Sequence, residues 1–443
     1  MTEERVVRTY MTLAGLYTLA ASLIWSVNTL FLLDAGLGVS EVFIANALFS
    51  AGMMIFEIPT GVVADTLGRR VSYLASVLIL SGTTVLYLVA AQAEAGLFVF
   101  GAVSILMGLG FTFYSGALEA WLVDGLAAVG ADRSLDMVFA RGSQISGAAM
   151  FSGTIAGGLL GQLDLAVPFI ARAVLLAIVF VLAGRLMHDI GFDRVPLHVR
   201  EVPRRMREQA AVGIAAGWNQ PGLRFLMLAG AVRGAFLGWA FYAAQPYLLK
   251  LLERDAVWVV GIITAGVSLA TIIGNQIVSY LRKRCTRRST MLIGASLTMT
   301  VSAVTIGATS SFAVAVAALL VMAGAMGVTM PVRQAYLHEV TESKDRATVV
   351  SFDAMIGSVG GVGGQVGLGA VSDARSFSAG YVIGGAATAL ALPLLLIVRR
   401  IGGRPDLVPD QVSDARSCPA GLPTQVGIES HTPESLERAD ALS

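Results

Sequence analysis

Long apolar stretches separated by short polar turns recur along the whole chain of 443 residues. Each stretch has about 20 residues or more, which as a helix crosses a hydrocarbon core of about 30 Å. The stretches lack the apolar-polar alternation typical of strands, and in lipid a helix satisfies its own backbone hydrogen-bonding groups. The pattern predicts twelve transmembrane helices, over residues 10–33, 42–63, 71–91, 97–123, 141–163, 167–187, 223–249, 257–281, 289–309, 312–337, 347–371 and 378–398.

The composition excludes a soluble domain of this size. Hydrophobic residues make up 55% of the chain and charged residues 14%, and the mean hydropathy is +0.73. The net charge of +1 gives no reason to expect a nucleic-acid partner. The first stretch follows Arg5 and Arg8 and has no small-residue cleavage site behind it, so we interpret it as a retained helix rather than a signal peptide.

Basic residues are distributed unevenly between the turns. With the N-terminus inside the cell, 24 Lys and Arg residues fall on the cytoplasmic side, and only Lys250, Arg254 and Arg375 fall on the other. Cytoplasmic segments of membrane proteins carry the excess of basic residues. We therefore predict a multi-pass protein of the cell (inner or plasma) membrane with both termini in the cytoplasm.

A polar stretch between the sixth and seventh predicted helices divides them into two groups. The predicted organisation is a six-helix bundle over 1–187, a cytoplasmic linker over 188–222, a second six-helix bundle over 223–400 and a disordered cytoplasmic tail over 401–443. Within the linker, residues 202–216 suit either an amphipathic helix on the membrane surface or a solvated connection. The tail is rich in Pro, Ser and acidic residues and lacks apolar periodicity.

The two groups of helices look like copies of each other. Trp25 corresponds to Trp239 at an offset of 214 residues, and further pairs follow in the same order at nearly the same offset. Gly61 with Arg69 and Arg70 matches 274 and 282–283, and the segment 119–122 matches 334–337. This agreement predicts a duplicated six-helix unit.

The turn after the second stretch carries a motif. It reads Gly-Val-Val-Ala-Asp-Thr-Leu-Gly-Arg-Arg from Gly61 to Arg70, and fills each named position of the pattern Gly-x-x-x-Asp-x-x-Gly-Arg-Arg/Lys. The motif resembles the signature loop of the major facilitator superfamily. The sequence segments around Glu57 and Glu119 resemble those of a prokaryotic branch of this superfamily that has drug-efflux-like members. The resemblance implies an all-α membrane protein with twelve transmembrane helices in two pseudo-symmetric six-helix bundles, and a substrate cavity between them.

In that family the loop joins the two bundles at the cytoplasmic side. Physically, Asp65 can accept hydrogen bonds at a helix N-terminus, and an arginine can pair with a carboxylate on a neighbouring span. The predicted cytoplasmic gate comprises Gly61, Asp65, Gly68, Arg69, Arg70, Glu119, Asp124 and Arg141. The alternative is that Arg69 and Arg70 have no gate role and only reflect the general excess of basic residues on the cytoplasmic side.

Ionisable residues inside the spans are costly and therefore candidates for function. Glu57, Glu119 and Asp353 are candidates for proton coupling, with static ion pairs as the alternative; Asp353 is expected to neutralise Arg346 or Arg141. Arg233 lies ten residues into the seventh span and is the leading cavity residue, unless an acid on a neighbouring helix pairs with it. Arg172 is expected to extend to the outer membrane surface. The remaining cavity candidates are Trp25, Asn28, Trp239, Tyr242 and Gln245.

No enzyme site is recognisable in the sequence. The four histidines lack metal-ligand spacing, and no phosphate-binding glycine-rich loop is present, so neither a metal, a cofactor nor ATP is expected. Thr154 and Ser104 replace residues typical of proton-coupled drug antiporters. We predict a monomeric secondary active transporter that exports a small amphipathic compound, with a proton or other ion as the coupling partner. The alternatives are uptake of a nutrient or organic anion, with Arg233 as counter-charge, and a transporter-like receptor or scaffold.

Overall fold

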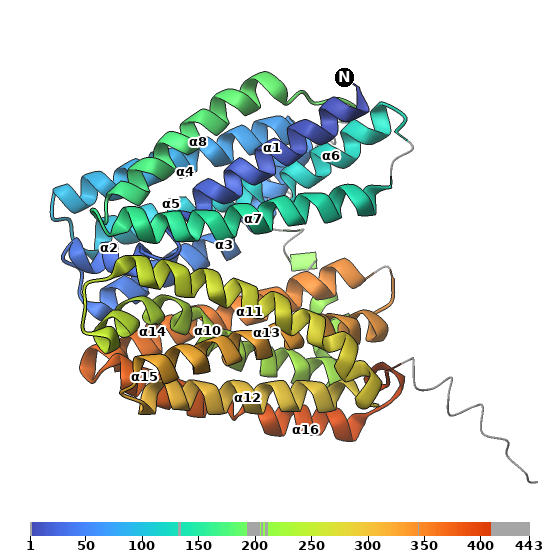
Figure 1. The fold of residues 1–443 in the computed structure, drawn as a ribbon. Coiled ribbons are helices and arrows are strands. Elements are labelled where there is room, and N and C mark those ends of the chain that lie inside the picture. Colours follow the sequence, from blue (N-terminus) through green and yellow to red (C-terminus); the bar gives the residue numbers. More distant parts are fainter. Residues whose placement is uncertain are drawn as a thin grey trace, which may run out of the picture.

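The described part of the chain is built of helices joined by short turns (Figure 1). The computed structural model describes residues 2–131, 134–192, 204, 207–208, 211–343 and 345–408. The helices of the first half are α1 (Glu3–Ser22), α2 (Asn28–Asp34), α3 (Val39–Leu67), α4 (Arg69–Gln92), α5 (Leu97–Tyr114), α6 (Ala117–Ala128), α7 (Leu135–Gly161) and α8 (Val167–Leu186). Those of the second half are η2 (Gly213–Trp218), α10 (Pro221–Leu252), α11 (Val257–Arg284), α12 (Arg288–Ala308), α13 (Phe312–Val340), α14 (Arg346–Ala374), α15 (Phe377–Thr388), α16 (Ala391–Ile401) and η3 (Arg404–Asp406).

Within the described residues, ten helical segments are long and apolar enough to cross a membrane. They correspond to ten of the twelve predicted spans, with α5 and α6 forming one segment and α15 and α16 another. The predicted first and fifth spans are also helical, but they are more polar. The first begins with the charged turns of α1 and is interrupted between α1 and α2, whereas α7 carries Asp136, Arg141 and many glycines.

The helices form two six-helix bundles with the same internal packing (Figure 1). In the first bundle α1 packs on α7, α3 on α5, and α4 on both α5 and α8. In the second bundle α10 packs on α14, α11 on α13, and α12 on both α13 and α15. Each of these four contacts of the first bundle thus has a counterpart in the second, in the same chain order, as a duplicated unit requires. The bundles meet where α3 packs on α14 and α7 on α11.

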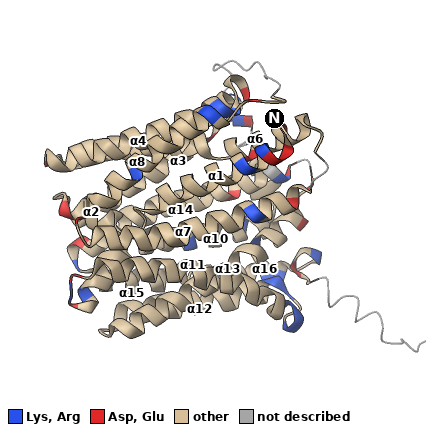
Figure 2. Ribbon diagram, turned by 45° about the horizontal axis from the view of Figure 1, so that its top comes forward, with Lys and Arg blue, Asp and Glu red and all other residues tan. Residues whose placement is uncertain are grey.

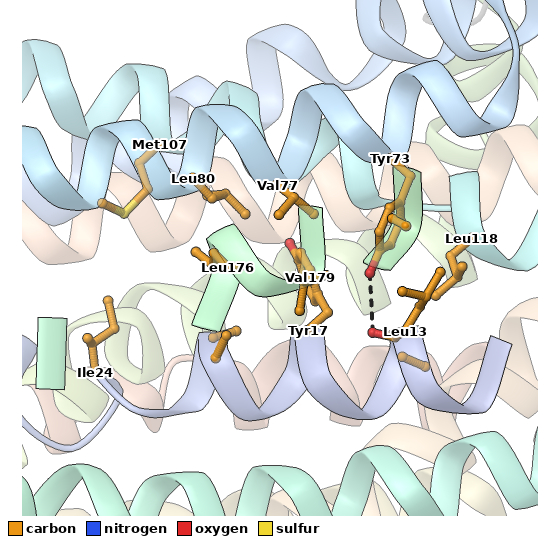
Figure 3. Packing of buried hydrophobic residues seen from close by; sticks show 14 of the residues in the cluster. Leu13, Tyr17, Ile24, Tyr73, Val77, Leu80, Met107, Leu118, Leu176 and Val179 are labelled. Carbon is orange, nitrogen blue, oxygen red and sulfur yellow. Dashed lines mark hydrogen bonds between the residues drawn. The ribbon is translucent and has the colours of Figure 1, made fainter. Parts of the chain in front are cut away.

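A cluster of buried apolar and aromatic side chains holds the first bundle together (Figure 3). Tyr73 of α4 is fully buried, and its hydroxyl donates a hydrogen bond to the carbonyl oxygen of Leu13 in α1, 3.2 Å away. Tyr17 stacks on Tyr114 with ring centroids 3.6 Å apart. The hydrogen bond satisfies the buried hydroxyl of Tyr73, for which neither lipid nor an apolar core would supply a partner.

The charged residues lie mainly at the two ends of the helices (Figure 2). Most of the basic ones gather at the end that holds the N-terminus. Large apolar side chains are exposed on the flanks, among them Phe98 at 89% and Val301 at 57%. An apolar flank between two charged ends matches a bilayer.

The chain remains packed beyond the position where the disordered tail was predicted to begin. Asp406 is buried and accepts hydrogen bonds from the amide and the hydroxyl of Ser289, at 2.7 and 2.8 Å. The amide of Val408 donates to the carbonyl oxygen of Thr286. Residues 402–408 therefore fasten the chain to α12, and the rest of the predicted tail lies outside the described residues. Of the predicted amphipathic piece over 202–216, residues 202–203, 205–206 and 209–210 also lie outside the described residues, and η2 begins within its last part.

Candidate functional site

The two bundles are joined by polar contacts at one end, which we call the junction. Ser40 of α3 donates to Asp373 of α14 at 2.8 Å, and Gln162 donates to the carbonyl oxygen of Asp255 at 3.0 Å. Gly158 of α7 and Gly261 of α11 lie in backbone contact, and a Cβ added to Gly158 would lie 2.7 Å from the Cα of Gly261. By the predicted orientation, the junction lies at the outer face of the membrane.

Gln245 of α10 forms the most specific contact of the junction. Helix α1 ends at Ser22 and α2 begins at Asn28, so the backbone between them is irregular. The Gln245 side chain accepts a hydrogen bond from the amide of Thr29 at 2.8 Å and donates one to the carbonyl oxygen of Trp25 at 2.9 Å. Because Gln245 is 1% exposed, the interrupted helix of one bundle is completed by a side chain of the other.

A pocket lies beside this interrupted helix, and we call it the central pocket. Its walls come from α1, α2, α3, α4, α5 and α8 of the first bundle, and from Tyr242 on α10 of the second. Three predicted cavity residues, Trp25, Asn28 and Tyr242, line it. Its other lining residues are Tyr17, Ala21, Ile24, Asn46, Phe49, Tyr87, Met107, Phe111 and Arg172.

Arg172 is the charged residue of the central pocket, and the expectation that it extends to the membrane surface is wrong. Its exposed fraction is 5%, and its Nε has no hydrogen-bond partner. Asn46 is also buried: its Oδ1 accepts from Nδ2 of Asn28 at 3.0 Å, while its own Nδ2 is unpaired. The sequence contained a signal for Arg172, because it is a cation inside an apolar stretch.

The remaining predicted cavity residues lie elsewhere. Trp239 is fully buried in the second bundle, where its ring packs against Tyr381 with centroids 4.9 Å apart. Arg233 lines a separate pocket formed by helices of the second bundle alone, together with Arg333.

Asp353 pairs with a residue that we did not predict. Both of its oxygens accept hydrogen bonds from the guanidinium of Arg333, one of them at 2.6 Å, and the two side chains are 9% and 13% exposed. The expected pairing with Arg346 or Arg141 is therefore replaced by a pair between α13 and α14. This pair occupies both oxygens of Asp353, which favours a structural role for this acid over proton transfer.

The hairpin motif forms a small charge cluster at the end opposite the junction. Arg69 donates to Asp65 at 2.6 Å, and its Nε lies 3.7 Å from Asp124 on α6. Arg70 donates to the carbonyl oxygen of Gly184, and its amide donates to Asp189 at 2.9 Å.

Position 68 requires glycine for two reasons. Its φ is +113°, and a Cβ there would collide with the Asp189 carboxylate. A side chain at this position would therefore be strained and would also displace the acid. Asp189 follows the sixth span and belongs to the predicted linker, and we did not expect it to hold the hairpin. Gly61 is exposed and has open space around it.

Two of the predicted gate residues, Glu119 and Arg141, do not take part in this cluster. Glu119 and Arg141 are exposed, and neither forms an ion pair within the described part of the chain. Glu57 is exposed as well and accepts a hydrogen bond from Ser115 at 3.3 Å. The described residues contain no group of three His, Cys, Asp or Glu side chains that could hold a metal ion.

Comparisons with known proteins agree with this architecture. The sequence profile of the Major Facilitator Superfamily matches residues 256–417. The chain is 25% identical over 362 residues to the tetracycline resistance protein, class G, of Vibrio anguillarum, covering 79% of this chain and 86% of the relative. The nucleoside transporter NupG superposes with a TM-score of 0.73 at 13% identity, over 89% of this chain and 99% of NupG. A peptide transporter POT superposes with a TM-score of 0.70 at 15% identity, over 90% and 95%.

Two packed six-helix bundles with a mainly aromatic pocket at their interface, together with relatives that are transporters, indicate a multi-pass membrane transporter rather than an enzyme. The profile match over residues 256–417 and the shared fold make the chain similar to the Major Facilitator Superfamily, as the hairpin motif had indicated.

Proposed function

We propose that the protein is a secondary active transporter that works by alternating access and exports a small amphipathic compound through the central pocket. The observation that carries this proposal is the position of that pocket. Tyr242 of the second bundle closes a pocket whose other walls belong to the first, so a tilt of one bundle against the other changes access to it. Drug resistance, the property named in the Vibrio anguillarum relative, favours export over uptake.

The arrangement of contacts supports a conformation closed at the junction and open at the hairpin end. The junction is held by Gln245 and by the pair of Ser40 with Asp373. At the hairpin end, Arg69 and Arg70 contact partners within their own bundle. With the termini inside, as the distribution of basic residues predicts, this conformation presents the pocket to the cytoplasm, where an exporter loads its substrate.

Glu57 and Glu119 are the better candidates for proton coupling. Neither forms an ion pair within the described residues, whereas Asp353 is bound by Arg333. An acid without a fixed cation can gain and lose a proton as its surroundings change between conformations. We infer that one of these two carries the proton and that Asp353 has a structural role.

The test is transport in proteoliposomes that contain the purified full chain. Flux of amphipathic compounds is measured with an imposed proton gradient and without one, beside the Glu57→Gln and Glu119→Gln variants. We expect gradient-driven flux in the wild type, and loss of the gradient dependence in one variant while exchange of substrate continues. Flux that ignores the gradient in the wild type would contradict proton coupling. The absence of flux for the whole compound panel would contradict export of amphipathic compounds.

A truncated chain tests the rival possibility of a receptor or scaffold that signals through its tail. The structure sets the cutting point: because residues 402–408 are fastened to α12, the chain should end after Val408. A transporter retains its flux after removal of 409–443. Loss of all activity by a truncated chain that is still folded would favour the rival.

A further inference from the structure

Arg172 is a cation inside the membrane-spanning part of the protein without an anion to balance it. It lies on the sixth residue of α8, is 5% exposed, and forms no hydrogen bond or ion pair with any described residue. An unpaired charge in such surroundings destabilises the folded protein, because a buried charge loses its hydration without gaining a counter-charge. Such a cost in the wall of a pocket indicates that the cation meets a partner that the described residues of the chain do not supply.

The surroundings of Arg172 favour a negatively charged partner. The central pocket contains no acidic residue. The ionisable groups beside Arg172 are the phenols of Tyr17 and Tyr87. The unpaired Nδ2 of Asn46 adds a second hydrogen-bond donor to the same pocket. A pocket that offers a guanidinium and a free amide donor suits a carboxylate, sulfonate or phosphate, whose oxygens accept from both.

The rest of the pocket is aromatic. Trp25, Phe49, Phe111 and Tyr242 line it together with Tyr87. Such walls bury an apolar body of a ligand, while the few polar groups fix the orientation of its head. Tyr242 comes from the second bundle, so a ligand that fills the pocket contacts both halves of the protein.

We propose that the substrate is an organic anion with an aromatic or apolar body, and that Arg172 binds its anionic group. The proposal rests on the central pocket being the transport site, and it names the substrate class for that site. It also assigns the counter-charge to Arg172 rather than to Arg233, which we expected from the sequence to hold this role in the alternative of uptake. Arg233 lies beside Arg333 and Asp353, and no residue of the first bundle lines its pocket. A ligand bound there would therefore contact only the second bundle.

The test compares ligands that share one body and differ in charge. Naphthalene carboxylate, naphthylmethylamine and naphthylmethanol are applied to the purified full chain in lipid nanodiscs, and binding is measured by calorimetry. We expect the carboxylate to bind best. Arg172→Gln should weaken its binding about 10- to 100-fold, the range of a hydrogen bond to a charged group, whereas Arg172→Lys retains part of the affinity. Arg233→Gln is the matched control and should leave the affinity within about twofold.

A second variant keeps the proposal testable if Arg172→Gln does not fold. Asn46→Asp places a carboxylate in the same pocket, where it pairs with Arg172 and competes with the ligand. We expect this variant to lose carboxylate binding and to fold at least as well as the wild type, because it neutralises the buried charge. Stronger binding of the amine or the alcohol, or unchanged carboxylate binding in the Arg172 and Asn46 variants, would overturn the proposal.

Transport measurements separate this inference from the proposed function. Gradient-driven flux of neutral or cationic compounds that is unaffected by Arg172→Gln would leave the transporter in place and remove the anion site. Arg172-dependent binding of the carboxylate without any flux would keep the anion site and contradict transport through it.

Discussion

The amide of Gln245 is the contact whose removal should most directly change the balance between the two conformations. In Gln245→Leu the side chain keeps its approximate size but loses both hydrogen bonds, so the Thr29 amide and the Trp25 carbonyl oxygen remain buried without partners. Hydrogen bonds between helices in membranes contribute about 0.6 to 1.7 kcal/mol each. Loss of both should destabilise the closed junction by about 1 to 3 kcal/mol, which shifts the ratio of open to closed about 5- to 150-fold.

Cross-linking across the junction measures this shift. Cysteines placed at Ser40 and Asp373, whose side chains are hydrogen-bonded in the closed junction, are joined by a short bifunctional reagent. The native Cys285 and Cys418 are replaced by serine. We expect the Gln245→Leu background to cross-link more slowly than the parent, in proportion to the smaller closed population.

The matched control is Gln162→Leu, which removes a different amide from the same junction. Gln162 is exposed to solvent, so water replaces its hydrogen bond and the cross-linking rate should change by less than about twofold. Equal rates in the Gln245→Leu and parent backgrounds would refute the reasoning. An equal decrease of the cross-linking rate in the Gln162→Leu background would show that the effect of losing a hydrogen bond at the junction does not depend on its burial.

Two further substitutions test the charge pairs. Asp65→Asn removes the 2.6 Å pair with Arg69; flux per milligram should fall several-fold while the unfolding free energy changes by less than about 1 kcal/mol, since both groups are partly exposed. Undiminished flux in the Asp65→Asn variant would contradict a gate role for Asp65. Asp353→Asn leaves Arg333 buried and uncompensated, which should cost about 3 to 5 kcal/mol and lower the thermal midpoint of unfolding. Addition of Arg333→Gln should restore part of the loss; a single variant as stable as the wild type contradicts a structural role.

The local sequence was enough to predict the helices and the hairpin. The predicted span over 71–91 differs from α4 (Arg69–Gln92) by two residues at one end and one at the other. Such agreement is expected, because insertion into lipid depends on the length and hydropathy of each segment alone. The break between α1 and α2 was not predicted, because residues 23–27 are as apolar as their neighbours, and Gln245, which completes the broken helix, is more than 200 residues away.

Only the tertiary structure decided which polar groups meet. Arg172 and Arg233 are both arginines in apolar stretches, and the sequence favoured the one nearer the membrane middle. Packing placed Arg172 without a partner among the aromatic walls of the central pocket, and Arg233 beside the Arg333–Asp353 pair.

The physical reason lies in the solvent. Lipid is as apolar as a protein core, so a transmembrane helix shows little difference between its outer and inner faces in sequence. The order of apolar and charged residues therefore determines how often and in which direction the chain crosses the membrane. The rotation of each helix about its axis, and with it the partner of each buried charge, is determined by packing between helices that are distant in the chain.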